Sequence, residues 1–149
     1  MEEYNYDTLV DSTTIEDISF DEINRGIFRR LKENEEDFEC LVICDDRRYN
    51  NEKYKFVSMD LEEIGWLGYF IGKNTSVKWL IFDASAIPPH SGTFCRGLNM
   101  NNTLQKISFR GTDLLNGQVL RMMDPFFKNN HNLTEIEVCD CELGTEDDS

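Results

Sequence analysis

The sequence predicts an α/β repeat fold in which short parallel strands alternate with helices. Three segments, which begin at Val77, Leu104 and Leu133, carry apolar residues at positions 1, 4 and 6. Their starting points are 27 and 29 residues apart, and an asparagine lies three residues before each of them. One such unit cannot bury its apolar face alone, so successive units must stack and share a core.

The pattern continues beyond each strand. Position 9 holds a small polar or thiol residue, and position 11 holds an aliphatic residue. Position 9 lies where the chain turns inward, so we expect its side chain to satisfy buried backbone groups. The residues are Ser85, Thr112 and Cys141 at position 9, and Ile87, Leu114 and Leu143 at position 11.

This frame, L-x-x-L-x-L-x-x-(N/C/S/T)-x-L, resembles leucine-rich repeats of the ribonuclease-inhibitor-like class. The resemblance covers Leu61 to Leu143, although Phe82, Phe109 and Val138 replace the usual leucine at position 6. It implies a short right-handed solenoid, with a parallel sheet on the concave side and helices on the convex side.

We divide the chain into an acidic N-terminal segment (1–18), a leucine-rich-repeat domain (19–143) and an acidic tail (144–149). Within the domain, residues 19–60 form an irregular unit and residues 61–143 form the regular repeats. The N-terminal segment has no basic and few aliphatic residues, so we expect disorder or a loose strand at one end of the solenoid. An acidic interaction tail is its functional alternative.

Two segments of the irregular unit have their own signals. Ser19 and Glu22 have the spacing of a capping box, and apolar residues from Phe20 onward predict a helix over residues 20–34. The segment 38–44 is a buried strand that fits an irregular first repeat.

The segment 54–59 has two interpretations. It fits either a degenerate repeat step, with Tyr54, Val57 and Met59 at positions 1, 4 and 6, or a second strand in a hairpin with the strand before it, and the sequence favours neither.

Further helices are expected between the regular strands. Asp60 is a suitable N-cap for a helix over 61–71 that ends at Gly72, and its Gly65 and Gly68 suggest close packing against a neighbouring unit. We also expect helices over residues 92–98 and 114–129, the second broken near Asp124 by Pro125.

The composition limits the possible partners. The chain has 149 residues, of which 40% are hydrophobic, so one domain with a sizeable core is expected. Its 29 acidic and 15 basic residues give a formal charge of −14, which argues against binding to nucleic acid or an anionic membrane. The charge favours solubility and allows a basic protein partner. We expect a monomer rather than a homo-oligomer.

Several absences lead us to expect a cytoplasmic protein. The sequence has no apolar run of membrane-spanning length and no N-terminal signal-peptide pattern. Its five cysteines are an odd number, which suits reduced thiols rather than a disulfide framework.

The candidate binding residues lie between the core positions of the strands and therefore face the concave surface. Trp79 beside Ile81 would form an apolar anchor, because tryptophan dominates interface hot spots; the alternative is that Trp79 packs beneath the N-terminal segment. We expect ion pairs between adjacent strands, from Lys106 to Glu135 and from Asp83 to Arg110. The predicted partner-binding residues are Trp79, Ile81, Asp83, Lys106, Ser108, Arg110, Glu135 and Glu137.

Nothing in the sequence predicts catalysis, a cofactor or a metal. Cys139 and Cys141 would place one thiol on the concave face and one in the core, which disfavours shared metal binding. His90 and His131 have no serine or cysteine partner at a recognisable spacing.

The expected function is therefore a non-catalytic protein–protein interaction module of the leucine-rich-repeat type. The alternative is a structural fragment or subunit that self-assembles through an exposed C-terminal edge strand, unless the acidic tail guards that edge. Light scattering separates the two, because self-assembly makes the particle size depend on concentration.

Overall fold

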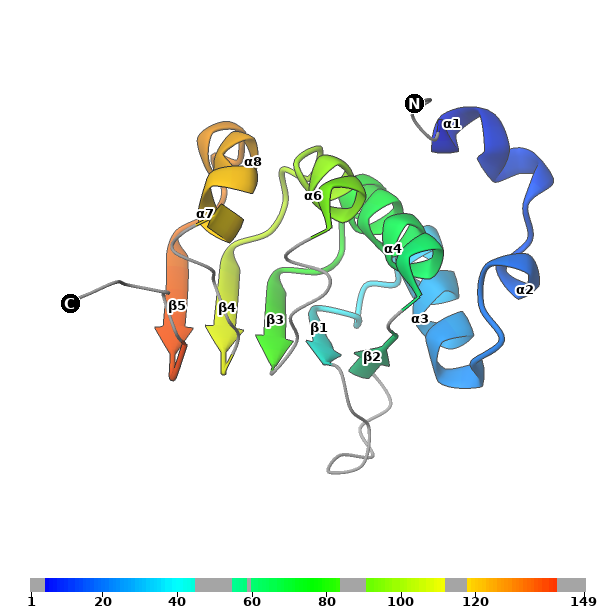
Figure 1. The fold of residues 1–149 in the computed structure, drawn as a ribbon, viewed down its shortest axis with the longest axis horizontal. Helices are drawn as coiled ribbons and strands as arrows, with labels where there is room; N and C mark the ends of the chain where they lie inside the picture. The colour runs from blue at the N-terminus through cyan, green and yellow to red at the C-terminus, as the bar shows by residue number, and fades with distance from the viewer. Residues whose placement is uncertain (1–4, 45–54, 59, 84–90, 112–117, 142–149) are drawn as a thin grey trace.

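Five strands form one parallel sheet (Figure 1). The computed structural model describes residues 5–44, 55–58, 60–83, 91–111 and 118–141. The strand order is β2–β1–β3–β4–β5, so the fold class is α/β with a parallel sheet. The strands are β1 (Cys40–Cys44), β2 (Lys55–Val57), β3 (Trp79–Asp83), β4 (Lys106–Arg110) and β5 (Glu135–Cys139).

Equivalent repeat positions lie directly opposite one another in this sheet. Position 4 aligns Leu80 of β3 with Ile107 of β4 and Ile136 of β5. The three segments therefore begin neighbouring, equivalent steps, as the repeat pattern predicts. β1 joins the same alignment with Leu41 opposite Leu80, which agrees with the irregular first repeat expected over residues 38–44.

Strand β2 fits neither interpretation of residues 54–59. It pairs in parallel with β1, whereas a hairpin would be antiparallel, and it lies on the far side of β1 from β3. Phe56 is opposite Ile43 and fully buried, so the inward position is one residue earlier than the frame through Val57 assumed.

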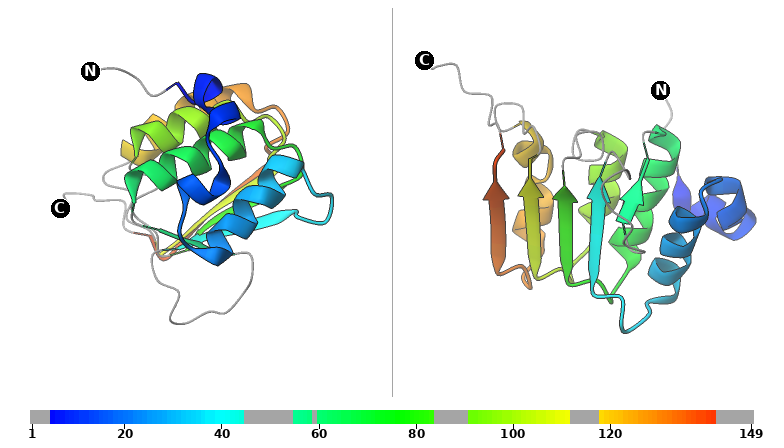
Figure 2. Two further views of the ribbon diagram at one scale, coloured as in Figure 1. Left: turned by 90° about the vertical axis from the view of Figure 1, so that its right-hand side faces the viewer. Right: turned by 90° about the horizontal axis from the view of Figure 1, so that it is seen from below.

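The helices α4, α6, α7 and α8 lie on one side of the sheet, and α3 lies beyond its β2 edge (Figures 1 and 2). The break expected near Asp124 is confirmed, because one helix ends at Met122 and the next carries Pro125 in its first turn. Within the described residues, no helix combines the length and hydrophobicity needed to cross a bilayer. The helices are α3 (Glu22–Glu33), α4 (Leu61–Lys73), α6 (Gly92–Leu98), α7 (Gln118–Met122) and α8 (Asp124–Asn129).

The start of α3 differs from the expectation. Asp21, rather than Ser19, is the N-cap, and its side chain accepts a hydrogen bond from the Asn24 N–H at 2.9 Å. The predicted capping box is therefore wrong, and Phe20 lies before the helix with 93% of its surface exposed. The inward residues of α3, among them Phe28, are buried and cover the β2 end of the core.

The structure of the N-terminal segment also differs from the expectation. Its described part is helical rather than disordered or extended, and Thr14 and Asp17 form a capping box. Tyr6 packs edge-on against Trp66 of α4 with ring centroids 4.5 Å apart. Aromatic packing thus orders a stretch whose acidic composition pointed to disorder. The elements are α1 (Tyr6–Leu9), a 3₁₀ turn (Val10–Ser12) and α2 (Ile15–Ile18).

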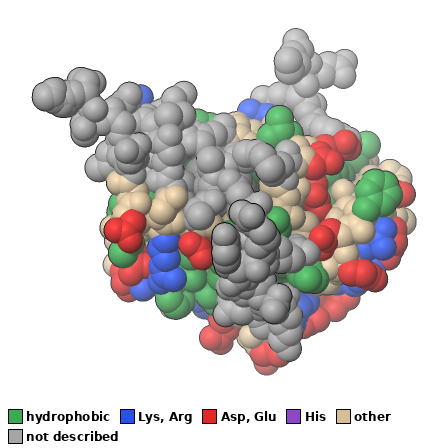
Figure 3. Space-filling model, turned by 60° about the horizontal axis from the view of Figure 1, so that its bottom comes forward, with side chains coloured by type: hydrophobic (Ala, Val, Ile, Leu, Met, Phe, Trp, Pro, Cys, Tyr) green, Lys and Arg blue, Asp and Glu red, His purple; other side chains and the backbone are tan. Residues whose placement is uncertain are grey.

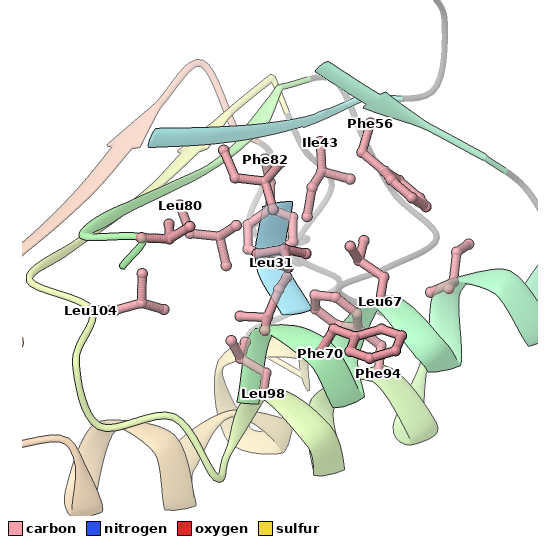
Figure 4. Close-up of a cluster of buried hydrophobic side chains, with 14 of the residues drawn as sticks. Leu31, Ile43, Phe56, Leu67, Phe70, Leu80, Phe82, Phe94, Leu98 and Leu104 are labelled. Carbon is pink, nitrogen blue, oxygen red and sulfur yellow. The ribbon is translucent and has the colours of Figure 1, made fainter. Parts of the chain in front are cut away.

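The core lies between the sheet and the helices (Figure 4). Phe82 of β3 stacks on Phe109 of β4 with ring centroids 5.2 Å apart, and it meets Phe94 of α6 edge-on. Each fully buried side chain of this size contributes about 1.5–3 kcal/mol to stability.

Glycines bring two of the covering helices into backbone contact. A Cβ atom at Gly68 of α4 would lie 2.5 Å from the carbonyl oxygen of Phe94 in α6. This is the close packing expected at Gly68, and a Cβ atom at Gly65 would meet the side chains of Tyr6 and of Thr93 in α6. Gly72 does not end α4, which continues to Lys73. Gly72 instead makes a further close contact with Gly97 of α6.

An asparagine precedes each of the strands β3, β4 and β5, and Asn74 and Asn101 bond to the backbone of the preceding unit. Asn74, Asn101 and Asn130 are all buried. Asn101 donates from Nδ2 to the carbonyl oxygens of Ile71 (2.8 Å) and Asn74 (3.1 Å) in the preceding unit. Its Oδ1 accepts from the N–H groups two and three residues further on, both at 2.9 Å. The asparagine side chain therefore satisfies the backbone where each helix turns into a strand.

Position 9 can be assessed in one copy. The thiol of Cys141 donates to the carbonyl oxygen of Phe109 at 3.2 Å, so it satisfies a backbone group as expected. Other predicted features lie outside the described residues: Ser85, Thr112, Ile87, Leu114, Leu143, Tyr54, Met59, His90 and the tail 144–149.

Candidate functional site

Alternate residues of the five strands lie on the side of the sheet away from the helices, here called the outer sheet face. The eight predicted residues all belong to it, on β3, β4 and β5. The sheet register aligns Cys40, Trp79, Lys106 and Glu135 in one row, Lys55, Val42, Ile81, Ser108 and Glu137 in the next, and Val57, Cys44, Asp83, Arg110 and Cys139 in the third.

Trp79 is fixed in place on this face. Its indole Nε1–H donates to Ser108 Oγ at 2.9 Å. Lys106 Nζ lies 4.3 Å from the ring centroid and Arg110 Cζ lies 5.5 Å from it, both within cation–π range. The side chain is partly exposed. Trp79 does not pack beneath the N-terminal segment, because that segment lies against α4 through Tyr6.

Charged side chains of β4 and β5 pair across the two strands. Lys106 Nζ lies 3.0 Å from Glu135 Oε2, which confirms one expected ion pair. Arg110 donates to Glu137 Oε1 from both Nε (3.2 Å) and Nη2 (3.1 Å). Figure 3 shows basic and acidic side chains next to one another on the β5 side of the molecule.

The expected pair between Asp83 and Arg110 is wrong. Although these residues are opposite in the register, the long Arg110 side chain reaches diagonally to Glu137. Asp83 instead lies 3.8 Å from Nζ of Lys55, which belongs to β2 on the same face, two strands away from β3 in the direction opposite to β4.

The environment keeps the Glu137 carboxylate ionised. A hydrogen bond from Ser108 and a second from Arg110 lower the pKa of Glu137 below its usual value of 4.5. Ser108 thus holds both the indole of Trp79 and the carboxylate of Glu137.

Two of the eight predicted residues are buried. Ile81 is 5% exposed and Ser108 is fully buried. Ser108 therefore positions Trp79 and Glu137 rather than offering its own surface to a partner. The exposed part of the predicted site consists of Trp79, Asp83, Lys106, Arg110, Glu135 and Glu137.

The outer sheet face also contains residues that the sequence reasoning did not assign. Lys55 is buried and pairs with Asp83, but its place depends on the register of β2, which no repeat frame predicted. Cys40, Val42 and Cys44 could have been assigned, because the frame that starts at Phe38 places them at the outward positions 3, 5 and 7.

Residues that could bind a metal are scattered in the described part of the chain. Across residues 5–44, 55–58, 60–83, 91–111 and 118–141, no three His, Cys, Asp or Glu side chains are grouped for metal binding. Cys139 is exposed, Cys141 contacts the backbone of Phe109, and His131 is exposed in the turn before β5.

Comparison with known proteins gives a likeness in fold. No protein-family model matches the sequence. No curated protein matches it either. Among solved structures, "Leiomodin-1 Actin-Binding Site 2 (ABS2)" superposes with a TM-score of 0.59 at 14% sequence identity. The match covers 81% of this chain and 64% of the other, so this protein spans about 64% of that chain's length.

Proposed function

We propose that this chain is a short leucine-rich-repeat solenoid of the ribonuclease-inhibitor-like class that binds another protein through its outer sheet face, without catalysis. Support comes from the parallel strands in register, the near-constant period and the helices on the opposite side. The likeness in fold to a protein-binding segment of another protein is consistent with this proposal.

The observation that carries the proposal is the fixed, partly exposed Trp79. Its hydrogen bond to Ser108 and the flanking Lys106 and Arg110 hold the ring in one orientation before any partner arrives. A side chain that is already ordered loses little conformational entropy on binding. Tryptophan is also among the residues most enriched at interface hot spots. The ion pairs beside it supply a polar rim.

The partner in this proposal is a protein with a basic contact surface. The formal charge of −14 steers basic proteins toward the chain and repels nucleic acid and anionic membranes. We place the protein in the cytoplasm as a monomer, where its cysteines stay reduced.

A capture experiment with Trp79→Ala tests the proposal. The wild-type chain should retain a partner from native lysate, and Trp79→Ala should weaken that binding by about 30-fold or more, as the loss of a hot spot of ~2 kcal/mol implies. Met100→Ala is the control, because Met100 is 71% exposed and lies outside the outer sheet face. Purified actin is a first partner to test by cosedimentation, because the structural neighbour is described as an actin-binding site.

The thermal stability of both variants must be measured alongside. Trp79→Ala should remain folded, because it loses one hydrogen bond and two partly exposed cation–π contacts. Equal partner capture by wild type and folded Trp79→Ala would reject the proposed binding face.

The second candidate is self-assembly through β5. It is supported by the position of β5 at the edge of the sheet and by the exposure of its inward residues Ile136 and Val138. Light scattering at increasing concentration would show a growing particle if this candidate were correct.

A further inference from the structure

The two ends of the core differ in how they are covered. At the β2 end, α3 buries Ile27, Phe28 and Leu31 against the core. At the other end, the inward residues of β5 remain half exposed, 51% for Ile136 and 46% for Val138. The corresponding inward residues of β3 and β4 have no exposed surface: Leu80, Phe82, Ile107 and Phe109.

These two side chains line one wall of a groove, here called the β5 groove. Leu120 and Phe127, both partly buried, supply apolar surface from α7 and α8 on the opposite wall. The β5 groove is lined by Leu120, Arg121, Asp124, Phe127, Ile136 and Val138. It is thus a mainly apolar surface at the place that the next strand of a repeat array would cover.

The backbone of β5 is arranged to accept a further strand. The Glu135 N–H donates to Gln105 at 3.2 Å, and the carbonyl oxygen of Cys139 accepts from the Gly111 N–H at 2.9 Å. Because alternate residues of a strand direct their backbone groups to opposite edges, those of Ile136 and Val138 point away from β4. In the described part of the chain, β5 is one of the two edge strands, and β2 is the other.

The acidic residues of β5 favour some binding partners at this edge over others. Glu135 and Glu137 lie on the outer side of β5, and each has its basic partner on β4 only. A second copy paired edge to edge would bring these carboxylates next to their own equivalents, which is unfavourable. A strand that carries lysine or arginine at its outward positions would instead meet them with opposite charge.

We propose that the β5 groove binds an extended segment of a different protein, in which apolar residues alternate with lysine or arginine, as a sixth strand beside β5. The apolar residues of that segment cover Ile136 and Val138, its basic residues face Glu135 and Glu137, and its backbone pairs with the free edge. The β5 groove does not include Trp79, although Glu135 and Glu137 border both surfaces. Trp79→Ala and Val138→Lys therefore test the two proposals separately.

A synthetic peptide tests this inference on the full chain. The probe is the acetylated, fluorescently labelled peptide Lys-Val-Lys-Ile-Lys-Val-Lys-amide, and the control peptide has glutamate in place of each lysine. Fluorescence anisotropy measures affinity, and amide chemical shifts of ¹⁵N-labelled protein locate the bound peptide. The lysine peptide should bind at least tenfold more tightly than the glutamate peptide and should shift the amides of Ile136 and Val138.

Two charge-matched variants separate groove binding from general attraction to an acidic protein. Val138→Lys should weaken binding of the lysine peptide at least tenfold, whereas Met100→Lys, which changes the net charge equally, should change it less than twofold. Glu135→Lys provides a second test if Val138→Lys fails to fold, because it should reduce the preference for lysine over glutamate.

Three results would overturn the inference. They are equal losses from Val138→Lys and Met100→Lys, a lysine peptide that leaves the β5 amides unshifted, and a concentration-dependent dimer whose formation alone shifts those amides. The last result would assign the edge to a second copy of the chain.

Discussion

The buried asparagines allow a sharp test of how the repeat units are joined. Asn101 makes four hydrogen bonds to backbone groups, two as donor and two as acceptor. Replacement by alanine leaves two N–H groups and two carbonyl oxygens without these partners. At about 0.5–1.5 kcal/mol for each net hydrogen bond, Asn101→Ala should reduce the free energy of unfolding by ~3 kcal/mol.

Asn130 is the matched comparison. Its Oδ1 accepts from the Asn132 N–H at 3.0 Å, but its Nδ2 is buried without a hydrogen-bond partner among the described residues. Alanine at this position therefore removes one favourable hydrogen bond and one unsatisfied donor. We expect Asn130→Ala to cost about 1 kcal/mol or less.

Urea denaturation followed by circular dichroism measures both losses, and similar slopes in the two variants make the midpoints comparable. Asn101→Asp should fall between wild type and Asn101→Ala, because aspartate keeps the acceptors and loses the donors. Equal destabilisation by Asn101→Ala and Asn130→Ala would refute the reasoning. The advantage of asparagine at these positions would then not come from its side-chain hydrogen bonds.

Three further predictions concern packing, titration and thiol reactivity. Gly68→Ala should lower the free energy of unfolding by about 1–3 kcal/mol, because the added methyl group overpacks the contact with α6. Gly26→Ala has open space around its Cβ and should raise the free energy of unfolding by ~0.5–1 kcal/mol, as measured by thermal melts. A change of the same sign in both variants would contradict the backbone contact between Gly68 and Phe94. Because the pKa of Glu137 in the folded protein lies below 4.5, wild type should be more stable than Glu137→Gln above pH 4.5. This difference in stability should vanish as the pH falls through the folded pKa. A difference in denaturation midpoint that does not change with pH would show that ionised Glu137 does not stabilise the fold. Burial raises the pKa of Cys95 to about 11, so iodoacetamide should alkylate the exposed Cys139 first in peptide mapping by mass spectrometry, and early labelling of Cys95 would contradict its burial.

The regular strands could be predicted because their pattern repeats. A one-residue error at Val77, Leu104 or Leu133 would turn every apolar side chain of that strand to the other face, so the shared offsets determine the register. The frame that starts at Phe38 predicted the register of β1 against β3 for the same reason. At β2, three residues are too few to separate Phe56 from Val57 as the inward position.

The start of α3 and the N-terminal segment show where local patterns fail. Ser19 and Asp21 are both good N-caps, and the apolar Phe20 between them suggested an earlier start than the one adopted. Tyr6 is ordered through contacts with Trp66, about sixty positions away in the sequence, which composition alone does not reveal.

The face of the eight predicted residues could be predicted, and so could the pair of Lys106 with Glu135, but the partner of Arg110 could not. Alternation along the strands placed all eight residues on one face. The sequence argument paired only directly opposite residues, whereas Arg110 is long enough to reach Glu137 diagonally. Ser108 is buried because it lies between the two larger groups that it hydrogen-bonds, Trp79 and Glu137.

The glycine contact between α4 and α6 also affects the shape available to a partner. Strands lie about 4.8 Å apart, whereas packed helices usually need about 8–10 Å, and this mismatch is what bends a layered array. Gly68 and Gly97 let the two helix backbones touch, which reduces the mismatch at that step. The sheet should therefore be flatter around β3, so that Trp79 suits a broad, level contact better than a protruding loop.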